Sequence, residues 1–328
     1  MKQASRRKFI QRTATVAGGA LAIGVGAAAS AESAQGPSKS APQLSKTQKL
    51  RALLKKPGLV MAPEGYTVIT AKLAEAIGFE VIYIPGSMMS GTYWAVPDWG
   101  LITPTAMIEI AGRIAREISI PAISDADQGG GTALNVYHSV QQFEKAGIAG
   151  VHIEDTLNPK HADQRAGSGA RAASPASLES LERMVMRIRA AADARSDPDF
   201  VIIARTDEPD IEGILRRGTA FAKAGADVFM PRTIKPDQID RVTGEVGLPL
   251  LGVGLPIRDV RGTKLKVNIY PGLVSGPAVA LADTLLRELK EHGEVASRPE
   301  LRLRGDMMGQ LTNHAIYSGL AEKWTTTP

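Results

Sequence analysis

The fold of this chain is decided by a pattern that occurs twice, as Phe143-Glu-Lys-Ala-Gly-Ile-Ala-Gly-Val-His-Ile153 and as Phe221-Ala-Lys-Ala-Gly-Ala-Asp-Val-Phe-Met230. In each copy a helical pattern ends at a glycine, which adopts the left-handed conformation without steric cost. A short, continuous apolar run follows at once, as is typical of a parallel strand covered on both faces. The repeat therefore predicts helix–strand units of one parallel sheet.

Apolar runs of this kind recur along the chain, and amphipathic segments separate most of them. The predicted strands are 58–62, 81–84, 120–124, 150–154, 200–204, 227–230, 248–252 and 266–269. The predicted helices are 65–78, 105–117, 133–147, 176–194, 211–225, 235–244 and 278–291. Eight strands in about 240 residues, seven of them followed by a helix, predict an α/β fold, a (β/α)8 TIM barrel. A doubly wound sheet is the alternative, but no glycine-rich dinucleotide motif follows the first strand.

Composition excludes several classes of function. The chain has 328 residues, of which 44% are apolar and none is cysteine. Disulfide frameworks, thiolate zinc sites and cysteine nucleophiles are therefore excluded. The formal charge is +5, but five of the 39 basic residues lie within residues 1–31, which hold no acidic residue. The 34 basic residues that remain match the 34 acidic ones, so no nucleic-acid surface is indicated.

The N-terminal segment reads as a targeting signal. Ser5-Arg6-Arg7-Lys8-Phe9-Ile10 resembles a twin-arginine export motif, an apolar run spans 13–29, and Ala29-Ser30-Ala31 offers a cleavage site. We expect a periplasmic or secreted protein that uses the twin-arginine translocase, or a cytoplasmic one if the leader is not used. A single membrane anchor is the alternative.

The expected organisation has four parts. Residues 1–31 form the signal peptide, 32–46 a linker, 47–294 the barrel catalytic domain, and 295–328 a C-terminal helical extension that makes oligomer contacts.

Ionisable residues collect where the predicted strands end, which in a barrel is the functional face. Asp125 and Asp127 follow the third strand, Glu154 the fourth and Arg205 the fifth. In an extended backbone Asp125 and Asp127 face the same side, and hard carboxylates suit Mg²⁺ or Mn²⁺. Alternatively, these carboxylates cap the next helices or pair with Arg205. The three acids with one arginine favour a metal site.

Two long segments follow strands at this same face. Residues 86–103 and 156–173 are expected to be lids or surface excursions. Gln128-Gly-Gly-Gly131 is either a close backbone approach to a bound ligand or a flexible turn.

These residues resemble the isocitrate lyase/phosphoenolpyruvate mutase superfamily over about residues 45–290. The motifs that carry the resemblance are Ser124-Asp-Ala-Asp-Gln-Gly-Gly-Gly131, residues 133–136, residues 146–155, Val201-Ile-Ile-Ala-Arg-Thr-Asp207 and residues 97–100. The resemblance implies a (β/α)8 barrel, a homotetramer with an exchanged C-terminal helix, a Mg²⁺ cofactor and a small 2-oxo or 2-hydroxy carboxylate as substrate.

The resemblance also implies roles for individual residues. Asp125 would bind the metal directly, and Asp98, Asp127 and Glu154 would hold its waters. Arg205 would clamp the substrate carboxylate. A substrate-binding group of Tyr83, Gly86 and Ser87, and a catalytic group of Arg205, Lys160 and Asp98, complete the predicted site.

The departures from the family pattern narrow the function. The gate segment Asn158-Pro-Lys-His-Ala-Asp-Gln-Arg165 keeps its lysine but lacks the cysteine of isocitrate and methylisocitrate lyases, and resembles the Cys-free oxaloacetate decarboxylase branch. Pro231-Arg232 stands where the family usually has Pro-Glu, and Pro85 where a serine is common.

We therefore expect a lyase or decarboxylase that cleaves a carbon–carbon bond through an enolate. His161 and Tyr93 are candidate proton donors on side-chain chemistry alone. One alternative is a phosphorus–carbon bond enzyme of the phosphoenolpyruvate mutase or phosphonopyruvate hydrolase type. Another is an exported carboxylate-binding protein or an inactive relative.

Overall fold

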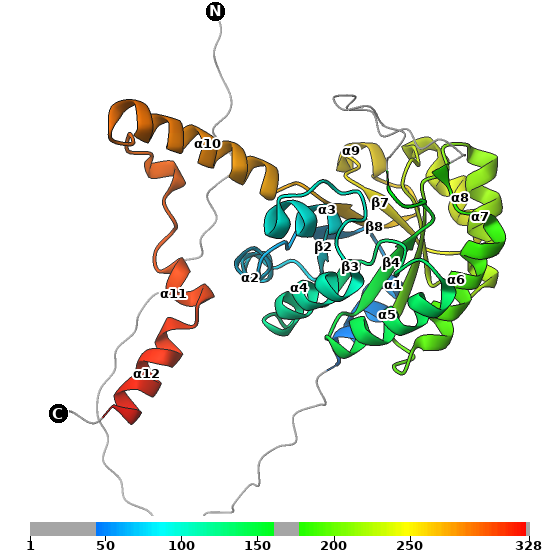
Figure 1. Cartoon of the computed structure of the whole chain (residues 1–328), viewed down its shortest axis with the longest axis horizontal. Helices are drawn as coiled ribbons and strands as arrows, with labels where there is room; N and C mark the ends of the chain where they lie inside the picture. The colour runs from blue at the N-terminus through cyan, green and yellow to red at the C-terminus, as the bar shows by residue number, and fades with distance from the viewer. Residues whose placement is uncertain (1–43, 161–176, 326–328) are drawn as a thin grey trace, which may run out of the picture. The chain divides into compact units, whose positions relative to one another are not determined.

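Eight parallel strands form one sheet, and helices lie around it (Figure 1). A computed structural model describes residues 44–160 and 177–325. The strands are β1 (Val60–Pro63), β2 (Ile82–Ile84), β3 (Ala122–Asp125), β4 (Gly150–Glu154), β5 (Val201–Thr206), β6 (Val228–Pro231), β7 (Leu250–Val253) and β8 (Leu265–Tyr270). Each lies at one of the predicted apolar runs.

The sheet is a TIM barrel. The strand order is β1-β8-β7-β6-β5-β4-β3-β2, and every pair in this order is parallel. A parallel bridge between Glu64 and Tyr83, with Gly65 N–H donating to the Tyr83 carbonyl at 2.8 Å, joins the two outer strands β1 and β2. The prediction of a (β/α)8 barrel is confirmed, and the doubly wound alternative was wrong.

Helices follow most of the strands and cover the barrel. They are α1 (Lys46–Lys55), α2 (Val68–Ile77), α3 (Gly86–Met89), the π-helical η1 (Ser90–Trp94), α4 (Pro104–Arg116), α5 (Ala133–Lys145), α6 (Leu181–Ala194), α7 (Ile211–Lys223), the 3-10 helix η3 (Pro236–Gln238), α8 (Ile239–Val246) and α9 (Ile257–Val260). Several begin at side-chain caps that satisfy the free N–H groups of the first turn. Thr132, for example, forms a reciprocal capping box with Asn135 at the start of α5.

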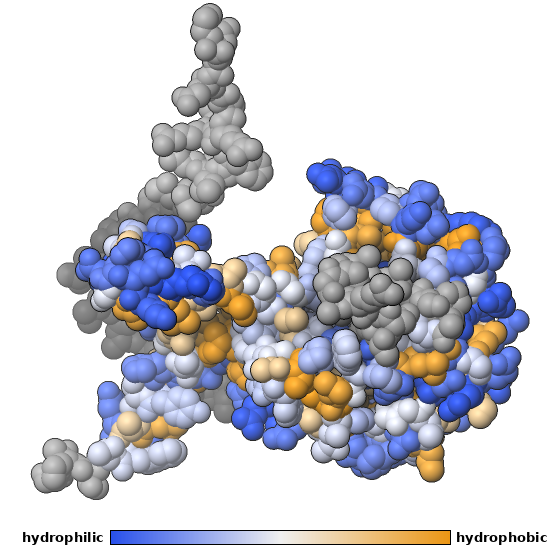
Figure 2. All heavy atoms as spheres, turned by 45° about the horizontal axis from the view of Figure 1, so that its top comes forward, coloured by the Kyte–Doolittle hydropathy of each residue, from blue (hydrophilic) through white to orange (hydrophobic). Residues whose placement is uncertain are grey.

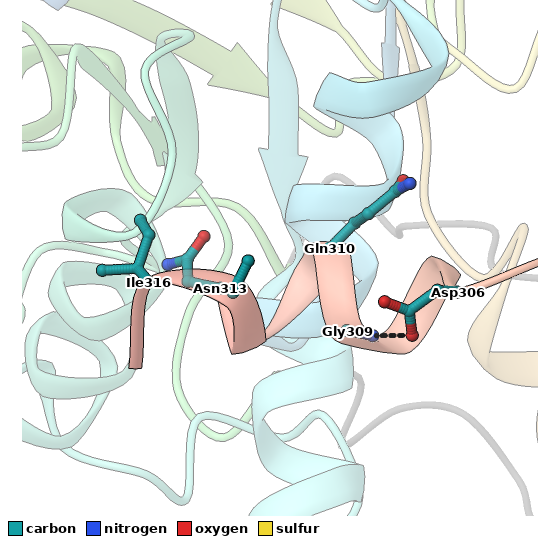
Figure 3. A pocket seen from close by; sticks show the side chains of 6 residues that line it. Asp306, Gly309, Gln310, Asn313 and Ile316 are labelled. Carbon is teal, nitrogen blue, oxygen red and sulfur yellow. Dashed lines mark hydrogen bonds between the residues drawn. The ribbon is translucent and has the colours of Figure 1, made fainter. Parts of the chain in front are cut away.

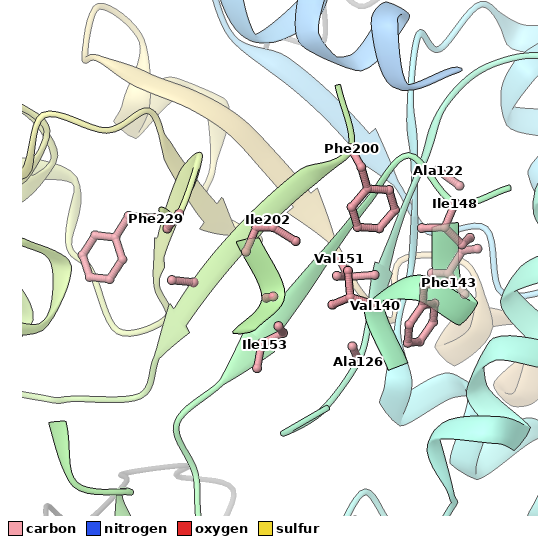
Figure 4. Close-up of a cluster of buried hydrophobic side chains, with 14 of the residues drawn as sticks. Ala122, Ala126, Val140, Phe143, Ile148, Val151, Ile153, Phe200, Ile202 and Phe229 are labelled. Atoms are coloured by element: carbon pink, nitrogen blue, oxygen red, sulfur yellow. The ribbon is translucent and has the colours of Figure 1, made fainter. Parts of the chain in front are cut away.

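Alternation along the strands separates two cores. On β5, Ile202 and Ala204 belong to the cluster between the strands and the helices, whereas Val201 and Ile203 belong to the cluster inside the barrel. Figure 4 shows part of the outer cluster, with Phe143 of α5 among the buried side chains. Since successive side chains point to opposite faces, the next inward position on β5 is Arg205.

Helix α1 was not predicted, and one face of it packs against the inner core. Leu50 and Leu53 are buried with the apolar residues inside the barrel. Another difference is the segment after β2, which was expected to be a loop. Its first part forms α3 and η1, and only the stretch from Ala95 to Thr103 is irregular.

The described C-terminal part is helical, with α10 (Ser275–His292), η4 (Pro299–Leu301), α11 (Met307–Leu311) and α12 (His314–Trp324). Within residues 44–160 and 177–325, none of the helices is both long and apolar enough to cross a membrane. The predicted leader and most of the predicted linker lie outside the described residues, as does most of the segment 156–173.

Candidate active site

Three carboxylates meet at the carboxyl ends of β3 and β4. Asp125, Asp127 and Glu154 each offer an oxygen, these oxygens lie within 4.8 Å of one another, and all three residues are buried. Buried carboxylates need a compensating cation, because desolvated negative charge is costly. Oxygen donors in such a set fit Mg²⁺ or Mn²⁺, which prefer carboxylate and water ligands. The acidic trio could therefore hold a divalent metal.

The turn after β3 holds two of these carboxylates in place. Asp125 accepts hydrogen bonds from the backbone N–H of Asp127 at 2.9 Å and of Gly86 at 3.2 Å. Asp127 adopts a positive φ of 49°, which is uncommon for a residue other than glycine. A side chain at Gly86 would place its Cβ 2.7 Å from an oxygen of Asp125. The close approach therefore requires glycine at position 86.

Lys160 places its ammonium group among these carboxylates. Its side chain is 1% exposed, and Nζ pairs with Asp127, with Glu154 at 3.1 Å and with Asp98 at 3.2 Å. Burial alone would lower the pKa of Lys160, but the surrounding carboxylates outweigh it and raise that pKa well above its usual value. Burial raises the pKa of Asp127 to about 7, against the opposing effect of Lys160. The structure thus brings Asp98, Asp127, Glu154 and Lys160 together; all four are among the residues proposed from the sequence for the site.

Arg205 lies on the other side of Glu154. Its Nη1 is 2.5 Å from Glu154 Oε2, and its Nε donates to Asp207 at 2.9 Å. Glu154 also accepts hydrogen bonds from Thr156 and from Gln128, the latter at 3.2 Å. Burial would raise the pKa of Glu154, but Arg205 and Lys160 hold it far below its usual range. Glu154 is therefore an anion that links Arg205 to the acidic trio.

Tyr83 joins the site through a residue that the sequence analysis missed. Its hydroxyl lies 2.8 Å from Nε2 of His152, and the two rings are stacked. Nδ1 of His152 is 3.5 Å from Asp125. Burial lowers the pKa of His152 despite the nearby Asp125, so the ring is neutral near pH 7. Strand alternation could have identified His152, because it lies two residues before Glu154 on the inward face of β4.

Three predicted residues remain, namely Ser87, Tyr93 and His161. Ser87 lies in the first turn of α3, next to Gly86, and is partly exposed. Tyr93 is 47% exposed, and its hydroxyl donates to the carbonyl of Tyr66. His161 lies outside the described residues. Tyr93 is therefore not placed among the buried groups around the acidic trio.

The carboxylates that face the helices form a separate network. Asp155 accepts hydrogen bonds from Thr206 at 2.5 Å and from the backbone N–H of Asp207 at 3.0 Å, and Arg217 of α7 lies 3.3 Å away. Burial raises the pKa of Asp155 to about 6. This network positions the backbone at the end of β5.

A pocket in the C-terminal helices is distinct from this site. It is lined by Asp306, Gly309, Gln310, Asn313, Ala315 and Ile316, and Figure 3 shows five of these labelled. None of the predicted site residues lines it.

Comparisons with known proteins agree on one family. The family model described as phosphoenolpyruvate phosphomutase matches residues 50–266. The oxaloacetate decarboxylase of Bradyrhizobium diazoefficiens is 36% identical over 281 residues, which cover 83% of this chain and 93% of that protein. The 2,3-dimethylmalate lyase of Eubacterium barkeri is 39% identical over 184 residues, 55% of this chain, and this match spans only 61% of that relative's length.

A comparison with solved structures points to the same family. The chain is similar to a phosphonopyruvate hydrolase in complex with oxalate and Mg²⁺, with a TM-score of 0.74 and 28% identity. The superposition covers 86% of this chain and 99% of that one.

Proposed function

Since the chain belongs to the isocitrate lyase/phosphoenolpyruvate mutase superfamily, we propose that it is a Mg²⁺-dependent lyase or decarboxylase that cleaves a carbon–carbon bond of a 2-oxo or 2-hydroxy (di)carboxylate. The relatives named 2,3-dimethylmalate lyase and oxaloacetate decarboxylase support this chemistry. So does the absence of cysteine, which favours the Cys-free, oxaloacetate decarboxylase-like branch. The observation that carries the proposal is the acidic trio with Arg205 beside it.

Asp125, Asp127 and Glu154 would hold the metal, which supplies a Lewis acid beside the substrate oxygens. Arg205 would bind the substrate carboxylate and stabilise the negative charge of the enolate that forms on bond cleavage. Tyr83, Gly86 and Ser87 would bind the same end of the substrate. Lys160, held by Asp98, would balance the charge of the carboxylates as the enolate forms.

The experiment is product analysis by proton and phosphorus NMR. Purified protein with Mg²⁺ would be given oxaloacetate, 2,3-dimethylmalate or phosphonopyruvate, with and without chelator. We expect metal-dependent cleavage of a carbon–carbon bond and its loss in Asp125→Ala. The matched control is Asp193→Ala, which removes an exposed aspartate at the end of α6. Turnover that survives in Asp125→Ala or in chelator would refute the metal's role.

A second candidate is chemistry at a phosphorus–carbon bond, as the matched family model and the phosphonopyruvate hydrolase neighbour suggest. Loss or formation of a phosphonate resonance would establish it. Mg²⁺-dependent binding of oxalate without turnover of any of the three compounds would favour the exported binding protein or inactive relative.

We further propose that the protein is exported. The twin-arginine-like motif at residues 5–10 and the possible cleavage site at residues 29–31 support this proposal. Replacing Arg6 and Arg7 together by lysine should retain the protein in the cytoplasm, as measured by fractionation. A protein that still reaches the periplasm after this change does not use the twin-arginine translocase.

A further inference from the structure

We propose that Gln128 is a positioning residue for the metal site, which holds the carboxylate of Glu154 in the orientation that a divalent cation and its water ligands require. This inference rests on the proposed function, because it takes Asp125, Asp127 and Glu154 to hold that cation. It gives a role to the side chain of Gln128, whose segment was considered in the sequence only as a turn or a close backbone approach.

The amide group of Gln128 is buried against Glu154. Its side chain belongs to a residue that is 3% exposed, and Nε2 donates to Glu154 Oε1 at 3.2 Å and to Thr156 Oγ1 at 3.0 Å. The hydroxyl of Thr156, which is also buried, donates to the same Oε1. Because this hydroxyl accepts from Gln128, its own proton is left to point at the carboxylate. Gln128 therefore fixes Glu154 both directly and through Thr156.

The backbone of the turn fixes Gln128 in turn. On one side of it, the N–H of Gly129 donates to the carbonyl of Ala126 at 2.8 Å. On the other side, the carbonyl of Asp127 accepts from the N–H of Glu154 at 2.9 Å. The second of these bonds joins the turn after β3 directly to the end of β4. The amide of Gln128 therefore reaches the carboxylate from a backbone that is held on both sides.

The partners of Glu154 differ in charge. Lys160 lies 3.1 Å from Oε1 and Arg205 2.5 Å from Oε2, and both positive charges repel a cation that approaches the same carboxylate. Gln128 and Thr156 are neutral, so they direct the carboxylate without this repulsion. Hydrogen bonds that orient the groups around a metal raise its affinity, and their loss typically lowers that affinity by about 10- to 100-fold.

The test measures the affinity for Mn²⁺ without turnover. Electron paramagnetic resonance of free Mn²⁺ would be recorded in titrations of the wild type, Gln128→Met and Gln142→Met. Methionine is similar to glutamine in length but has no amide. We expect Gln128→Met to bind Mn²⁺ about tenfold more weakly than the wild type. Gln142→Met makes the same change at a partly exposed position of α5, and its affinity should stay within about twofold of the wild type.

A thermodynamic cycle separates positioning of Glu154 from general support of the turn. In a Glu154→Gln background, Gln128→Met should change the Mn²⁺ affinity by less than about twofold, because no carboxylate remains to be oriented. An equal loss in both backgrounds, or an unchanged affinity in Gln128→Met, would overturn the inference and leave the proposed function standing. A wild type that does not bind Mn²⁺ would overturn both. If Gln128→Met does not fold, Thr156→Val removes the other neutral donor and replaces it in the same cycle, with the same outcomes.

Discussion

Lys160 and a divalent metal need the same oxygen atoms. The ammonium of Lys160 pairs with Asp127 and with Glu154, two of the three carboxylates that could hold the ion. A cation that enters must displace the ammonium or share these oxygens with it, and either costs binding free energy. The positive charge of Lys160 therefore lowers the affinity of the site for metal, while it keeps the buried carboxylates compensated.

We predict that Lys160→Met binds Mn²⁺ about tenfold or more tightly than the wild type. The reason is that this change removes the ammonium group, which competes with the metal for the carboxylate oxygens. Electron paramagnetic resonance of free Mn²⁺ in a titration measures this without turnover. Lys160→Arg keeps the charge and is the matched control, with an affinity close to that of the wild type. The gain in melting temperature on adding Mn²⁺ should also be larger in Lys160→Met. Equal Mn²⁺ affinities in all three proteins would contradict the competition.

The ion pairs of Asp207 with Arg205 and Arg232 predict a dependence of stability on pH. Burial would raise the pKa of Asp207, but Arg205 and Arg232 outweigh it and hold that pKa below its usual range. An aspartate with a lowered folded-state pKa stabilises the fold above its unfolded pKa of about 3.9, and this contribution is lost as pH falls through the folded-state pKa. Arg232→Gln removes one cause of the lowering.

The wild type should therefore be more stable than Arg232→Gln by about 1–3 kcal/mol between pH 5 and pH 8, with little change over that range. The difference should shrink as the pH is lowered below about 4. Urea denaturation of both proteins at pH 7, 5 and 3.5 measures it. If the difference in unfolding free energy between the two proteins grew on acidification, the ion pair of Arg232 with Asp207 would not stabilise the charged form of Asp207.

At the scale of elements, the strands and the residues at their ends were predictable, because both follow from local patterns. Continuous apolar runs marked all eight strands, and the alternation along β3, β4 and β5 brought Asp125, Glu154 and Arg205 to one face. The packing of Leu50 and Leu53 of α1 against the inner core was not predictable, since no local pattern says which surface an amphipathic helix covers. Helix α3 spans only four residues, too few to show a period.

The contacts that Lys160 and His152 make could not be predicted from the sequence either. Lys160 reaches the trio from the irregular segment after β4, and its position depends on tertiary contacts such as its backbone hydrogen bond to Trp99. His152 follows the alternation, but the partner of a buried histidine depends on the neighbouring strand, here Tyr83 on β2.

The turn between β3 and α5 offers a test of how an element supports the site. Gly129 has a φ of +65°, and a Cβ there would lie 2.7 Å from a methyl group of Val136. Gly131 also has a positive φ, but no atom lies within 4 Å of the position of its Cβ. We predict that Gly131→Ala costs about 1–2 kcal/mol of unfolding free energy from backbone strain alone. Gly129→Ala should cost a further 1–3 kcal/mol or so, because its methyl group overpacks the turn.

Thermal melting of the two variants side by side measures this difference. Equal losses of stability would show that the turn relaxes away from Val136 and that only the backbone conformation requires glycine.

At the scale of the whole molecule, the C-terminal helices present apolar side chains to solvent. In the 18-residue helix α10 only Ser275 is buried, while Val279, Leu286 and Leu289 are 71%, 65% and 49% exposed. Ile316 and Trp324 of α12 are similarly exposed, and Figure 2 shows hydrophobic patches on these helices. Ile316 also lines the pocket of Figure 3. Apolar helix faces of this kind are stable when another surface covers them. We propose that a second copy of the chain does so, as the expected homotetramer requires.

We predict that the wild type is a tetramer and that Leu286→Glu lowers its mass, because a charge on the apolar face of α10 would have to be buried in the interface. Light scattering coupled to size-exclusion chromatography measures the mass directly, against 34.7 kDa for one full-length chain. Lys290→Glu places the same side chain at an exposed polar position of α10 and should leave the assembly intact. A wild type that elutes as a monomer would contradict the proposal. An unchanged mass for Leu286→Glu would instead place the interface elsewhere, and would leave the apolar face of α10 to another partner.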